Sequence, residues 1–425
     1  MKDKGFKIFC TFGILLALVW IFYLFFGRLL VQAAYDGKAP AVFSHIIEGQ
    51  SVHPAEFYQT LALRFMKKIS VAAVAFCIVL IILAPFCGYL YKSNPNLLAF
   101  LGGILFCIIL TSSVEVFLRL YTPGKSDGLD QYYPPGYWHK DEFGIIEAIP
   151  GQHRSYKKSL KTNQFIYDVI YSIDKYGRRV TPVEETDKRN RFILFFGCSF
   201  TYGEGVQDRE TLPYYVGRLA AQHTPYNYGY HGLGPFDALA KIENIDFKKE
   251  VKEKEGIIIY TFIPDHFNRI VGSMSTMVWH FNGACYQKTP EGKLVRNGDF
   301  KTGRPVLTRI YSFLSKSRIL EAFKVNLPSR LGDRDLKLFV QTCQAMNTII
   351  NEKFPQSAFY VVIYPGTENS NRLVKYLREG GIKYLDYTQL FDPTNHGFHL
   401  SKYDDHPAPL AYRLIAEKIV KDLHL

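Results

Sequence analysis

Residues 191–206 read RFILFFGCSFTYGEGV, an apolar run that leads directly into a serine set among small residues. The run over 192–196 has no polar interruption, which is typical of a strand buried on both faces of a parallel sheet. Gly197 then allows the backbone to turn sharply at the carboxyl end of that strand. Because open α/β sheets bind their ligands at this end, the stretch predicts that Ser199 is displayed as a nucleophile.

The chain beyond residue 190 alternates apolar strands with amphipathic helices. This alternation indicates βα units on a parallel sheet and predicts a three-layer α/β/α fold. The expected strands are 191–197, 256–263, 357–364 and 382–386, and the expected helices are 209–221, 334–353, 368–379 and 407–423. Residues 267–330 show no clear period, so we expect an insertion that hangs over the carboxyl edge of the sheet.

Three apolar stretches precede this part of the chain, at 8–33, 69–91 and 97–114. Each approaches or exceeds the roughly 18–20 residues that cross a bilayer as a helix. The sequence therefore predicts a multi-pass membrane protein. Lysines at the start of the chain favour an inside N-terminus, which with three spans makes the C-terminal part extracytoplasmic. A basic cluster between the first two stretches argues for the reverse topology, which stays an alternative.

Composition excludes several other classes of protein. The net charge of +12 is spread along the chain, and no Lys/Arg run has the length of a nucleic-acid footprint. Four cysteines lie in the apolar stretches, and the other three, Cys198, Cys285 and Cys343, show neither disulfide nor zinc spacing. The histidines and aspartates over 396–406 match no common metal pattern. We therefore expect no metal, no cofactor and no nucleic-acid partner.

The stretch Asp404-Asp405-His406-Pro407 supplies a candidate base and orienting acid for Ser199. A serine hydroxyl is a poor nucleophile until a base takes its proton, and that base is usually a histidine oriented by a carboxylate. Pro407 fixes the backbone just before a predicted helix, so His406 can be held at a loop–helix junction. At this point either aspartate could be the orienting acid.

These two blocks together resemble the SGNH/GDSL hydrolase family, over about residues 190–425. The nucleophile block of that family reads Gly-Asp-Ser, where this chain has Cys198 in place of the aspartate, and its C-terminal block pairs Asp with His before Pro. The resemblance implies a flavodoxin-like parallel sheet and a catalytic triad. In it, Ser199 is the nucleophile, His406 is the base, and Asp404 orients His406 because Asp405 is poorly placed to reach the imidazole.

The resemblance also implies an oxyanion hole. The family uses the backbone N–H of the nucleophile together with a glycine and an asparagine on two middle loops. Residues 227–234, NYGYHGLG, resemble the glycine block, which makes the amides of Ser199 and Gly232 the expected donors.

The third block of the family does not match. Pro264 stands where the family has its asparagine, and proline has no N–H to donate. Either His266, Asn268 or Arg269 supplies a replacement donor, or the hole has two donors only.

Other interpretations of single residues compete with these. Ser199 could be a helix N-cap at the strand–helix junction, and Cys198 is expected to be a buried thiol. We expect His231 to line the cleft, where it could touch substrate. His266 could have a cleft role or be a structural histidine.

The sequence thus predicts a membrane-anchored serine esterase that hydrolyses small acyl esters on carbohydrate or lipid. Two alternatives stay open. The same acyl-enzyme could serve an O-acyltransferase acting on an envelope polysaccharide, or the domain could be an inactive binding or assembly module. The oligomeric state is not indicated. The predicted domains are 1–121, a membrane region with three transmembrane helices; 122–188, a linker with a small β-element; and 189–425, the hydrolase domain.

Overall fold

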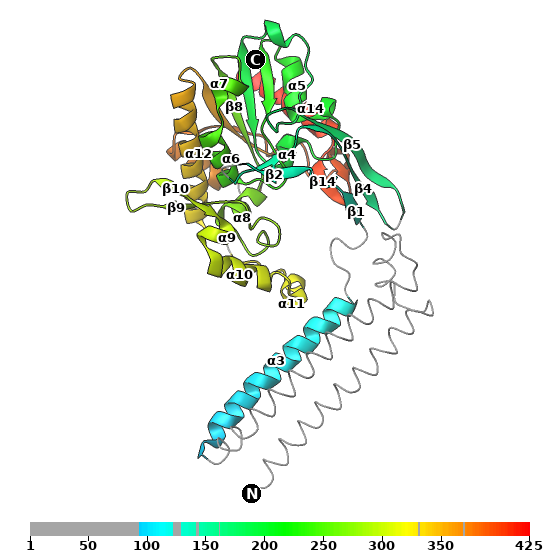
Figure 1. Cartoon of the computed structure of the whole chain (residues 1–425), viewed down its shortest axis with the longest axis vertical. Coiled ribbons are helices and arrows are strands. Elements are labelled where there is room, and N and C mark those ends of the chain that lie inside the picture. The colour runs from blue at the N-terminus through cyan, green and yellow to red at the C-terminus, as the bar shows by residue number, and fades with distance from the viewer. Residues whose placement is uncertain (1–92, 122–128, 142–143, 161, 330–331, 369) are drawn as a thin grey trace. The chain divides into compact units, whose positions relative to one another are not determined.

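The structure is a computed structural model that describes residues 93–121, 129–141, 144–160, 162–329, 332–368 and 370–425 (Figure 1). The chain divides into two compact units, Met1–Gly128 and Leu129–Leu425. In the first unit the described residues form helix α3, Pro95–Tyr121.

No helix within the described ranges combines the length and the apolar character that crossing a membrane requires. The span predicted at 97–114 is therefore not supported. The spans predicted at 8–33 and 69–91 lie outside the described residues.

A five-stranded parallel sheet forms the centre of the second unit (Figure 1). Its strands are β6 (Arg191–Phe196), β7 (His223–Asn227), β8 (Gly256–Phe262), β11 (Ala358–Ile363) and β12 (Lys383–Asp386). They lie in the order β12-β11-β8-β6-β7, which is the flavodoxin-like order of a doubly wound sheet. In such a sheet the ligand crevice opens at the carboxyl ends of the two strands where the direction of winding reverses. Here those two strands are β6 and β8.

Helices cover both faces of the sheet, as the predicted three-layer fold requires. Because successive residues of a strand point to opposite faces, Phe192, Leu194 and Phe196 pack into one core while Ile193 and Phe195 pack into the other. The helices on the first face are α6 (Pro235–Asn244), α12 (Asp333–Lys353) and α13 (Ser370–Glu379), and those on the second are α5 (Leu212–Leu219) and α14 (Pro409–Leu423). The uninterrupted apolar run of β6 thus supplies both cores.

The structure confirms the eight strands and helices predicted from the alternating pattern, with ends that differ by up to three residues. The largest difference is at α5, which begins at Leu212 rather than at 209. Thr211 caps this helix, since its side chain accepts a hydrogen bond from the Tyr214 N–H at 3.3 Å. A threonine in this position fixes the start of a helix, because it satisfies one of the free N–H groups of the first turn.

Residues 129–173 add a second, antiparallel sheet with the strand order β1-β4-β5. Its strands are β1 (Leu129–Tyr132), β4 (Gly151–Ser159) and β5 (Phe165–Ile173). Tyrosines on β5, among them Tyr167 and Tyr171, pack in one buried cluster with Tyr202, in the short helix after β6, and Tyr230, on the loop after β7. The small sheet therefore belongs to the same compact unit as the main sheet and reaches its carboxyl edge.

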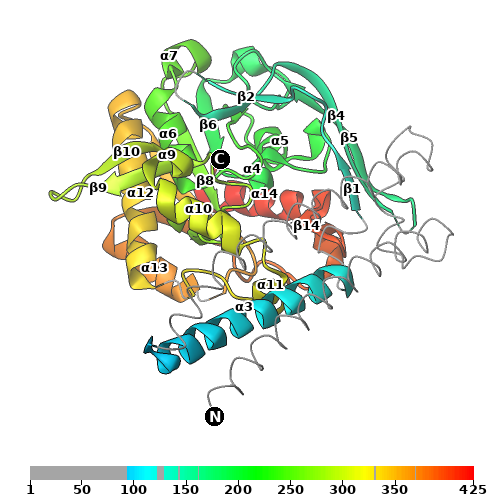
Figure 2. The same cartoon turned by 60° about the horizontal axis from the view of Figure 1, so that its bottom comes forward.

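The insertion at 267–330 consists of short elements, which explains why no single period is visible in its sequence. Helix α8 (Asp265–Val271) leads into it. The hairpin of β9 (Ala284–Lys288) and β10 (Leu294–Asp299) follows, and then α9 (Phe300–Gly303), α10 (Pro305–Leu314) and α11 (Arg318–Ala322). Figure 2 shows α9 and α10 beside the hairpin, at the end of the unit that this view brings forward.

Candidate active site

Ser199 lies at the first turn after β6, and Gly197 makes that turn possible. Gly197 has a φ of 150°, and a β-carbon at this position would collide with the Thr201 hydroxyl. The short helix α4 (Ser199–Tyr202) has Cys198 as its N-cap residue, without a side-chain capping bond. Ser199 is therefore not the N-cap, and its hydroxyl is left for another partner.

That partner is His406, which in turn contacts Asp404. Ser199 Oγ lies 2.9 Å from His406 Nε2, and His406 Nδ1 lies 2.6 Å from Asp404 Oδ1. Because an ionised carboxylate can only accept, Nδ1 carries the ring proton and Nε2 accepts from the Ser199 hydroxyl. In this arrangement a histidine can act as general base towards a serine.

A strand-like turn at the C-terminus holds the histidine and the aspartate together. Both lie on β14 (Asp404–Pro407), which pairs with β13 (His399–Ser401). Asp404 Oδ1 also accepts the backbone N–H of His406 at 3.1 Å, which fixes the carboxylate against the ring. The Asp405 residue is exposed, and its described contact to a histidine is through its backbone carbonyl, to His399. The structure thus places Asp404, and not Asp405, beside the His406 imidazole.

The small antiparallel sheet supplies a second partner for Asp404. Lys157, on β4, places its Nζ 2.8 Å from Asp404 Oδ2. Burial raises the pKa of Asp404, but the hydrogen bond to His406 and the ion pair with Lys157 together hold this pKa below its ordinary value. Asp404 is therefore ionised and occupied on both oxygens.

Glu204 is a second carboxylate at the site, and the sequence reasoning did not assign it a role. Its Oε2 lies 3.4 Å from His406 Nε2 and 2.6 Å from His231 Nδ1. Its Oε1 accepts a hydrogen bond from the Tyr133 hydroxyl at 2.8 Å and one from Gln131 Nε2 at 3.2 Å. Burial raises the pKa of Glu204, yet the nearby histidines lower it well below the ordinary range. Glu204 is thus a buried negative charge next to His406.

The loop that carries Glu204 is held by a buried arginine. Arg179 donates to the carbonyl oxygens of Tyr202 and Gly203 and, at 2.6 Å, to that of Val206. It also forms an ion pair with Asp208 at 3.0 Å. Because the guanidinium binds carbonyls on both sides of Glu204, it sets the position of this carboxylate.

The two carboxylates, Glu204 and Asp404, raise the pKa of His406. Burial by itself lowers the pKa of His406, but the charge of Glu204 and the hydrogen bond to Asp404 outweigh it, so the pKa lies above its ordinary value. A base with a raised pKa accepts the serine proton more readily. A raised pKa also means that, as the pH falls, the imidazole becomes protonated at a higher pH and can then no longer act as a base.

Replacing Glu204 by glutamine is expected to move the pH profile of catalysis. Removing the negative charge 3.4 Å from Nε2 lowers the pKa of His406, so the acidic limb of kcat/KM shifts to lower pH. The measurement is kcat/KM for a soluble acyl ester across the pH range, with Glu379→Gln, an exposed site on α13, as the matched control. An unchanged limb in Glu204→Gln would show that the charge does not act on His406.

His231 lies beside Glu204 rather than at the serine. Its Nδ1 bonds to Glu204 as given above, and its Nε2 lies 3.2 Å from the Tyr137 hydroxyl. The ring is surrounded by tyrosines, including Tyr202 at a centroid distance of 4.4 Å. Since both ring nitrogens have partners, the structure places His231 as a support for Glu204, and its predicted contact with substrate stays a prediction.

The replacement donors considered after Pro264 have other partners, except that the Nε2 atom of His266 is buried without a hydrogen-bond partner among the described residues. His266 is fully buried, with its Nδ1 2.9 Å from the Tyr260 hydroxyl, and burial lowers its pKa. Arg269 donates to the Asp265 carboxylate and the Leu233 carbonyl. Asn268 is likewise engaged, donating to Asp265 and accepting from Asn326. Within the described ranges none of the three is hydrogen-bonded to Ser199 or His406, so the structure does not place His266 as a donor in the cleft.

Two backbone amides remain for an oxyanion hole. In the part of the chain that the structure describes, no group accepts a hydrogen bond from the N–H of Ser199 or of Gly232. Gly232 adopts a φ of 70°, which an L-residue rarely does. A β-carbon there would lie 2.9 Å from the Trp279 ring. Trp279, from the insertion, therefore lies against the Gly232 loop, and the sequence reasoning did not single it out.

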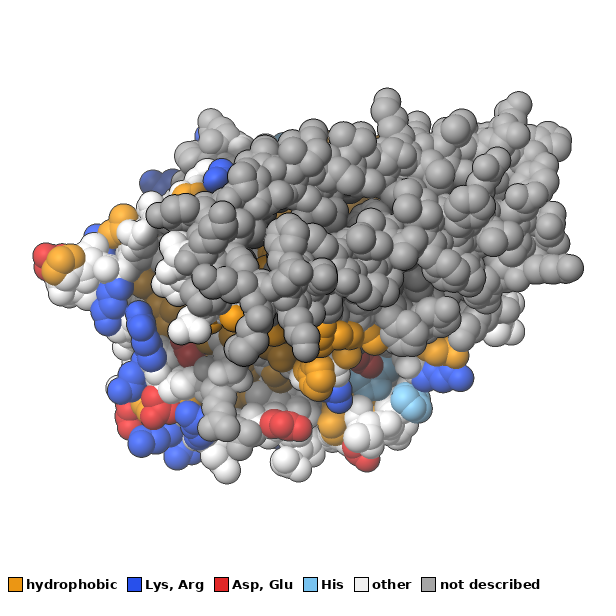
Figure 3. Space-filling model, turned by 90° about the horizontal axis from the view of Figure 1, so that it is seen from below, with side chains coloured by type: hydrophobic (Ala, Val, Ile, Leu, Met, Phe, Trp, Pro, Cys, Tyr) orange, Lys and Arg blue, Asp and Glu red, His pale blue; other side chains and the backbone are white. Residues whose placement is uncertain are grey.

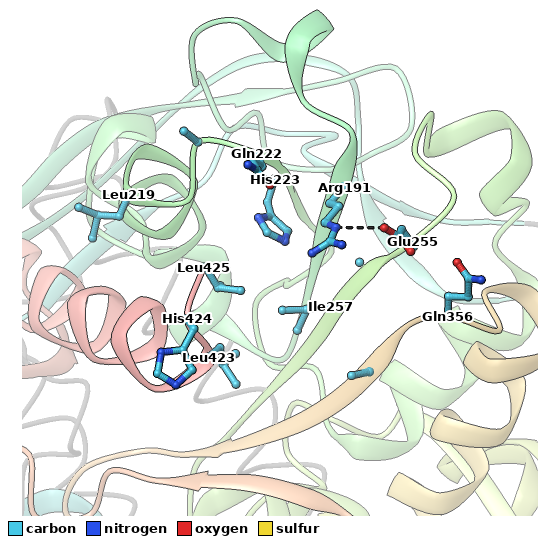
Figure 4. A pocket seen from close by; sticks show the side chains of 13 residues that line it. Arg191, Leu219, Gln222, His223, Glu255, Ile257, Gln356, Leu423, His424 and Leu425 are labelled. Carbon is cyan, nitrogen blue, oxygen red and sulfur yellow. Dashed lines mark hydrogen bonds and ion pairs between the residues drawn. The ribbon is translucent and has the colours of Figure 1, made fainter.

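A cavity of about 550 Å³ lies elsewhere on the molecule. Figure 4 shows Arg191, Glu255, Ile257 and the C-terminal Leu425 among its lining residues. Four strands of the main sheet, β6, β7, β8 and β11, begin at residues that line the cavity. The cavity is thus at the amino ends of the strands, away from the edge that carries Ser199.

Comparisons with solved structures find distant likenesses only. A member of the lipolytic protein G-D-S-L family from Veillonella parvula is 16% identical, with 54% of this chain and 97% of that chain covered and a TM-score of 0.31. An acetyl xylan esterase from Butyrivibrio proteoclasticus is 12% identical, with coverage of 60% and 66% and a TM-score of 0.32. A family two carbohydrate esterase from Cellvibrio japonicus is 11% identical, with coverage of 70% and 97% and a TM-score of 0.35. No family model and no curated protein matches the chain.

Proposed function

We propose that the chain is a serine esterase of the SGNH type. The observation that carries the proposal is the continuous hydrogen-bonded chain from Ser199 through His406 to Asp404, with distances of 2.9 Å and 2.6 Å. Its place supports the proposal too, because Ser199 follows β6 at the carboxyl edge where doubly wound sheets bind ligands. The N–H groups of Ser199 and Gly232 have no acceptor among the described residues, which leaves them for the oxyanion.

The proposed reaction begins with attack of Ser199 Oγ on the carbonyl carbon of an ester. His406 Nε2 takes the hydroxyl proton, while the carbonyl oxygen becomes an oxyanion that accepts the Ser199 and Gly232 N–H groups. When the intermediate collapses, the bond to the leaving alcohol breaks and His406 returns the proton to that oxygen. Water then attacks the acyl-enzyme with the same base, which releases the acid and restores the serine.

The imidazolium formed in each step has two acceptors at Nε2. One is the reacting oxygen at the position of Ser199 Oγ, and the other is the Glu204 carboxylate. A fixed negative charge near a developing positive charge stabilises the intermediate, because it requires no reorganisation at the moment of reaction. We assign Glu204 this stabilising role in the proposed mechanism.

The proposed substrates are small acyl esters on carbohydrate or lipid. The Trp279 ring lies against Gly232, and we propose that it restricts the acyl group to a short one. We also propose that the enzyme is tethered to a membrane, on the ground of the apolar stretches 8–33 and 69–91 in the sequence.

Labelling with a fluorophosphonate and turnover of p-nitrophenyl esters test this function. We expect the folded protein to be labelled and to hydrolyse the acetate at least about tenfold faster, in kcat/KM, than the octanoate, since a short pocket excludes the additional methylenes. Folded protein that neither takes the label nor turns over an ester would favour the inactive binding or assembly module instead. Equal rates for both esters would contradict the short acyl pocket alone.

A further inference from the structure

The insertion carries an unusual exposed apolar surface. Helix α10 has Val306, Ile310 and Phe313 exposed, at the spacing that places side chains on one face of a helix. Phe313 is 77% exposed, and Phe323, just after α11, is 78% exposed. Figure 3, which looks at the molecule from below, shows hydrophobic side chains together with lysine and arginine side chains in the coloured part of the view.

This surface continues to the rim of the candidate active site. Ser312 Oγ on α10 donates to the Met277 carbonyl at 3.0 Å, and Tyr311 packs against the buried cluster that contains Met277. The next two residues, Val278 and Trp279, are 52% and 47% exposed. Trp279 is the residue whose ring lies against Gly232. We call Val278, Trp279, Val306, Ile310, Phe313 and Phe323 together the apolar rim.

The part of the apolar rim that contains Phe323 is also held against the segment before Trp279. The Met274 N–H donates to the Leu327 carbonyl at 2.7 Å, and the Ser275 N–H donates to Asn326 Oδ1 at 3.0 Å. These bonds hold the chain after α11 against residues 274–275. The apolar rim is therefore a connected part of the fold and not a set of separate side chains.

Positive charge surrounds the apolar rim. Residues 300–325 contain six Lys/Arg and a single acidic residue, Glu321, which pairs with Arg318 at 2.7 Å. Lys301, Arg309 and Lys324 are exposed. Short helices with exposed aromatic and aliphatic side chains on one face and basic residues around them lie in the interface of anionic bilayers.

We propose that the apolar rim docks onto the surface of a bilayer that contains anionic phospholipid. A second copy of the chain fits less well, because a two-fold interface would bring the same lysines and arginines face to face. Docking would place the Ser199 edge beside the bilayer, so the proposal extends the proposed function towards esters held at or near a lipid surface.

The three tryptophans of the chain, Trp20, Trp138 and Trp279, make a direct test possible. The full chain with Trp20→Phe and Trp138→Phe keeps Trp279 as its single tryptophan. It is reconstituted in vesicles of phosphatidylcholine with brominated acyl chains, with or without phosphatidylglycerol. The matched control keeps Trp138, which is 51% exposed on strand β2 (Trp138–Lys140), and carries Trp20→Phe and Trp279→Phe.

We expect most of the Trp279 emission to be quenched when phosphatidylglycerol is present, less in phosphatidylcholine alone or at high salt, and the Trp138 control to stay unquenched. Adding Phe313→Glu and Phe323→Glu should remove the quenching, whereas Val295→Glu, at an exposed apolar site on the hairpin, should not. Quenching that persists in the double Glu variant would overturn the proposal. So would unquenched, blue-shifted Trp279 emission in both detergent and vesicles, which would mean that protein covers the surface.

Equal quenching with and without phosphatidylglycerol would overturn the assignment of an anionic bilayer. None of these measurements requires turnover. A protein that docks but hydrolyses no ester would therefore refute the proposed function and leave the docking proposal intact, and a soluble-ester activity without quenching would do the reverse.

Discussion

Replacing Ser199 by alanine is expected to lower kcat for acetyl-ester hydrolysis by about 10⁴- to 10⁶-fold, to the level that a site without its nucleophile retains. The structure gives the reason, because Ser199 is the hydroxyl that His406 Nε2 contacts, at 2.9 Å. The fold should survive. The hydroxyl has this one side-chain bond among the described residues, and His406 keeps its bond to Asp404 at 2.6 Å.

The measurement is steady-state hydrolysis of p-nitrophenyl acetate together with fluorophosphonate labelling and a thermal melt. Ser275→Ala, an exposed serine in the insertion, is the matched control and should retain activity and label. Full activity in Ser199→Ala would refute the assignment of the nucleophile. A low activity accompanied by a large drop in melting temperature would instead indicate a structural defect. In that case, the residue of the wild-type protein that carries the fluorophosphonate identifies the nucleophile.

Replacing His406 by alanine is expected to lower kcat by a similar factor, about 10⁴- to 10⁶-fold, because the serine loses the base that takes its proton. Asp404 remains paired with Lys157 at 2.8 Å, so no buried carboxylate is left without a partner. Residues that act as a unit are not additive. The double variant Ser199→Ala, His406→Ala should therefore be no slower than either single variant.

Added imidazole provides a second test of the base. If the imidazole ring is missing and the rest of the site is intact, exogenous imidazole should restore part of the activity of His406→Ala and none of that of Ser199→Ala. His424→Ala, an exposed site near the C-terminus, is the control and should behave as wild type. Additive losses in the double variant would argue against a single catalytic unit.

The parts of the site that the sequence predicts are those that lie on short local motifs. The apolar run of β6 followed by Gly197 shows that Ser199 stands at a strand end, and the stretch 404–407 places an aspartate next to a histidine. Only two local signals are needed for these residues. The alternation of strands and helices then predicts a parallel sheet, and both motifs are expected at its carboxyl edge.

Long-range partners could not be predicted in this way. Lys157 and Gln131 come from strands that precede the main sheet, and nothing in their own neighbourhoods marks them as partners of Asp404 or Glu204. The sequence did contain a signal for Glu204. This carboxylate stands between two glycines, shortly after Ser199. Trp279 lies in the insertion, where short elements with changing period hide the fold.

The loop after β8 shows a second limit of the sequence. Counting along the family pattern reaches Pro264 and suggests that His266, Asn268 or Arg269 replaces the asparagine. In the structure these side chains have structural partners instead, because the residues from Asp265 onward are already helical. The role of a side chain in a helix depends on the residues that pack against it. The spacing of a sequence motif does not show which residues these are.

The ion pair between Lys157 and Asp404 joins residues 247 positions apart in the chain, and Glu204 binds Gln131 and Tyr133 from the same early region. A fragment cut at residue 189, at the boundary that the nucleophile motif suggests, would keep all three triad residues and lose every one of these early contacts. The compact unit that holds these contacts begins at Leu129. We expect that moving the main sheet into another protein without the small sheet would separate the proposed triad from Lys157, Gln131 and Tyr133.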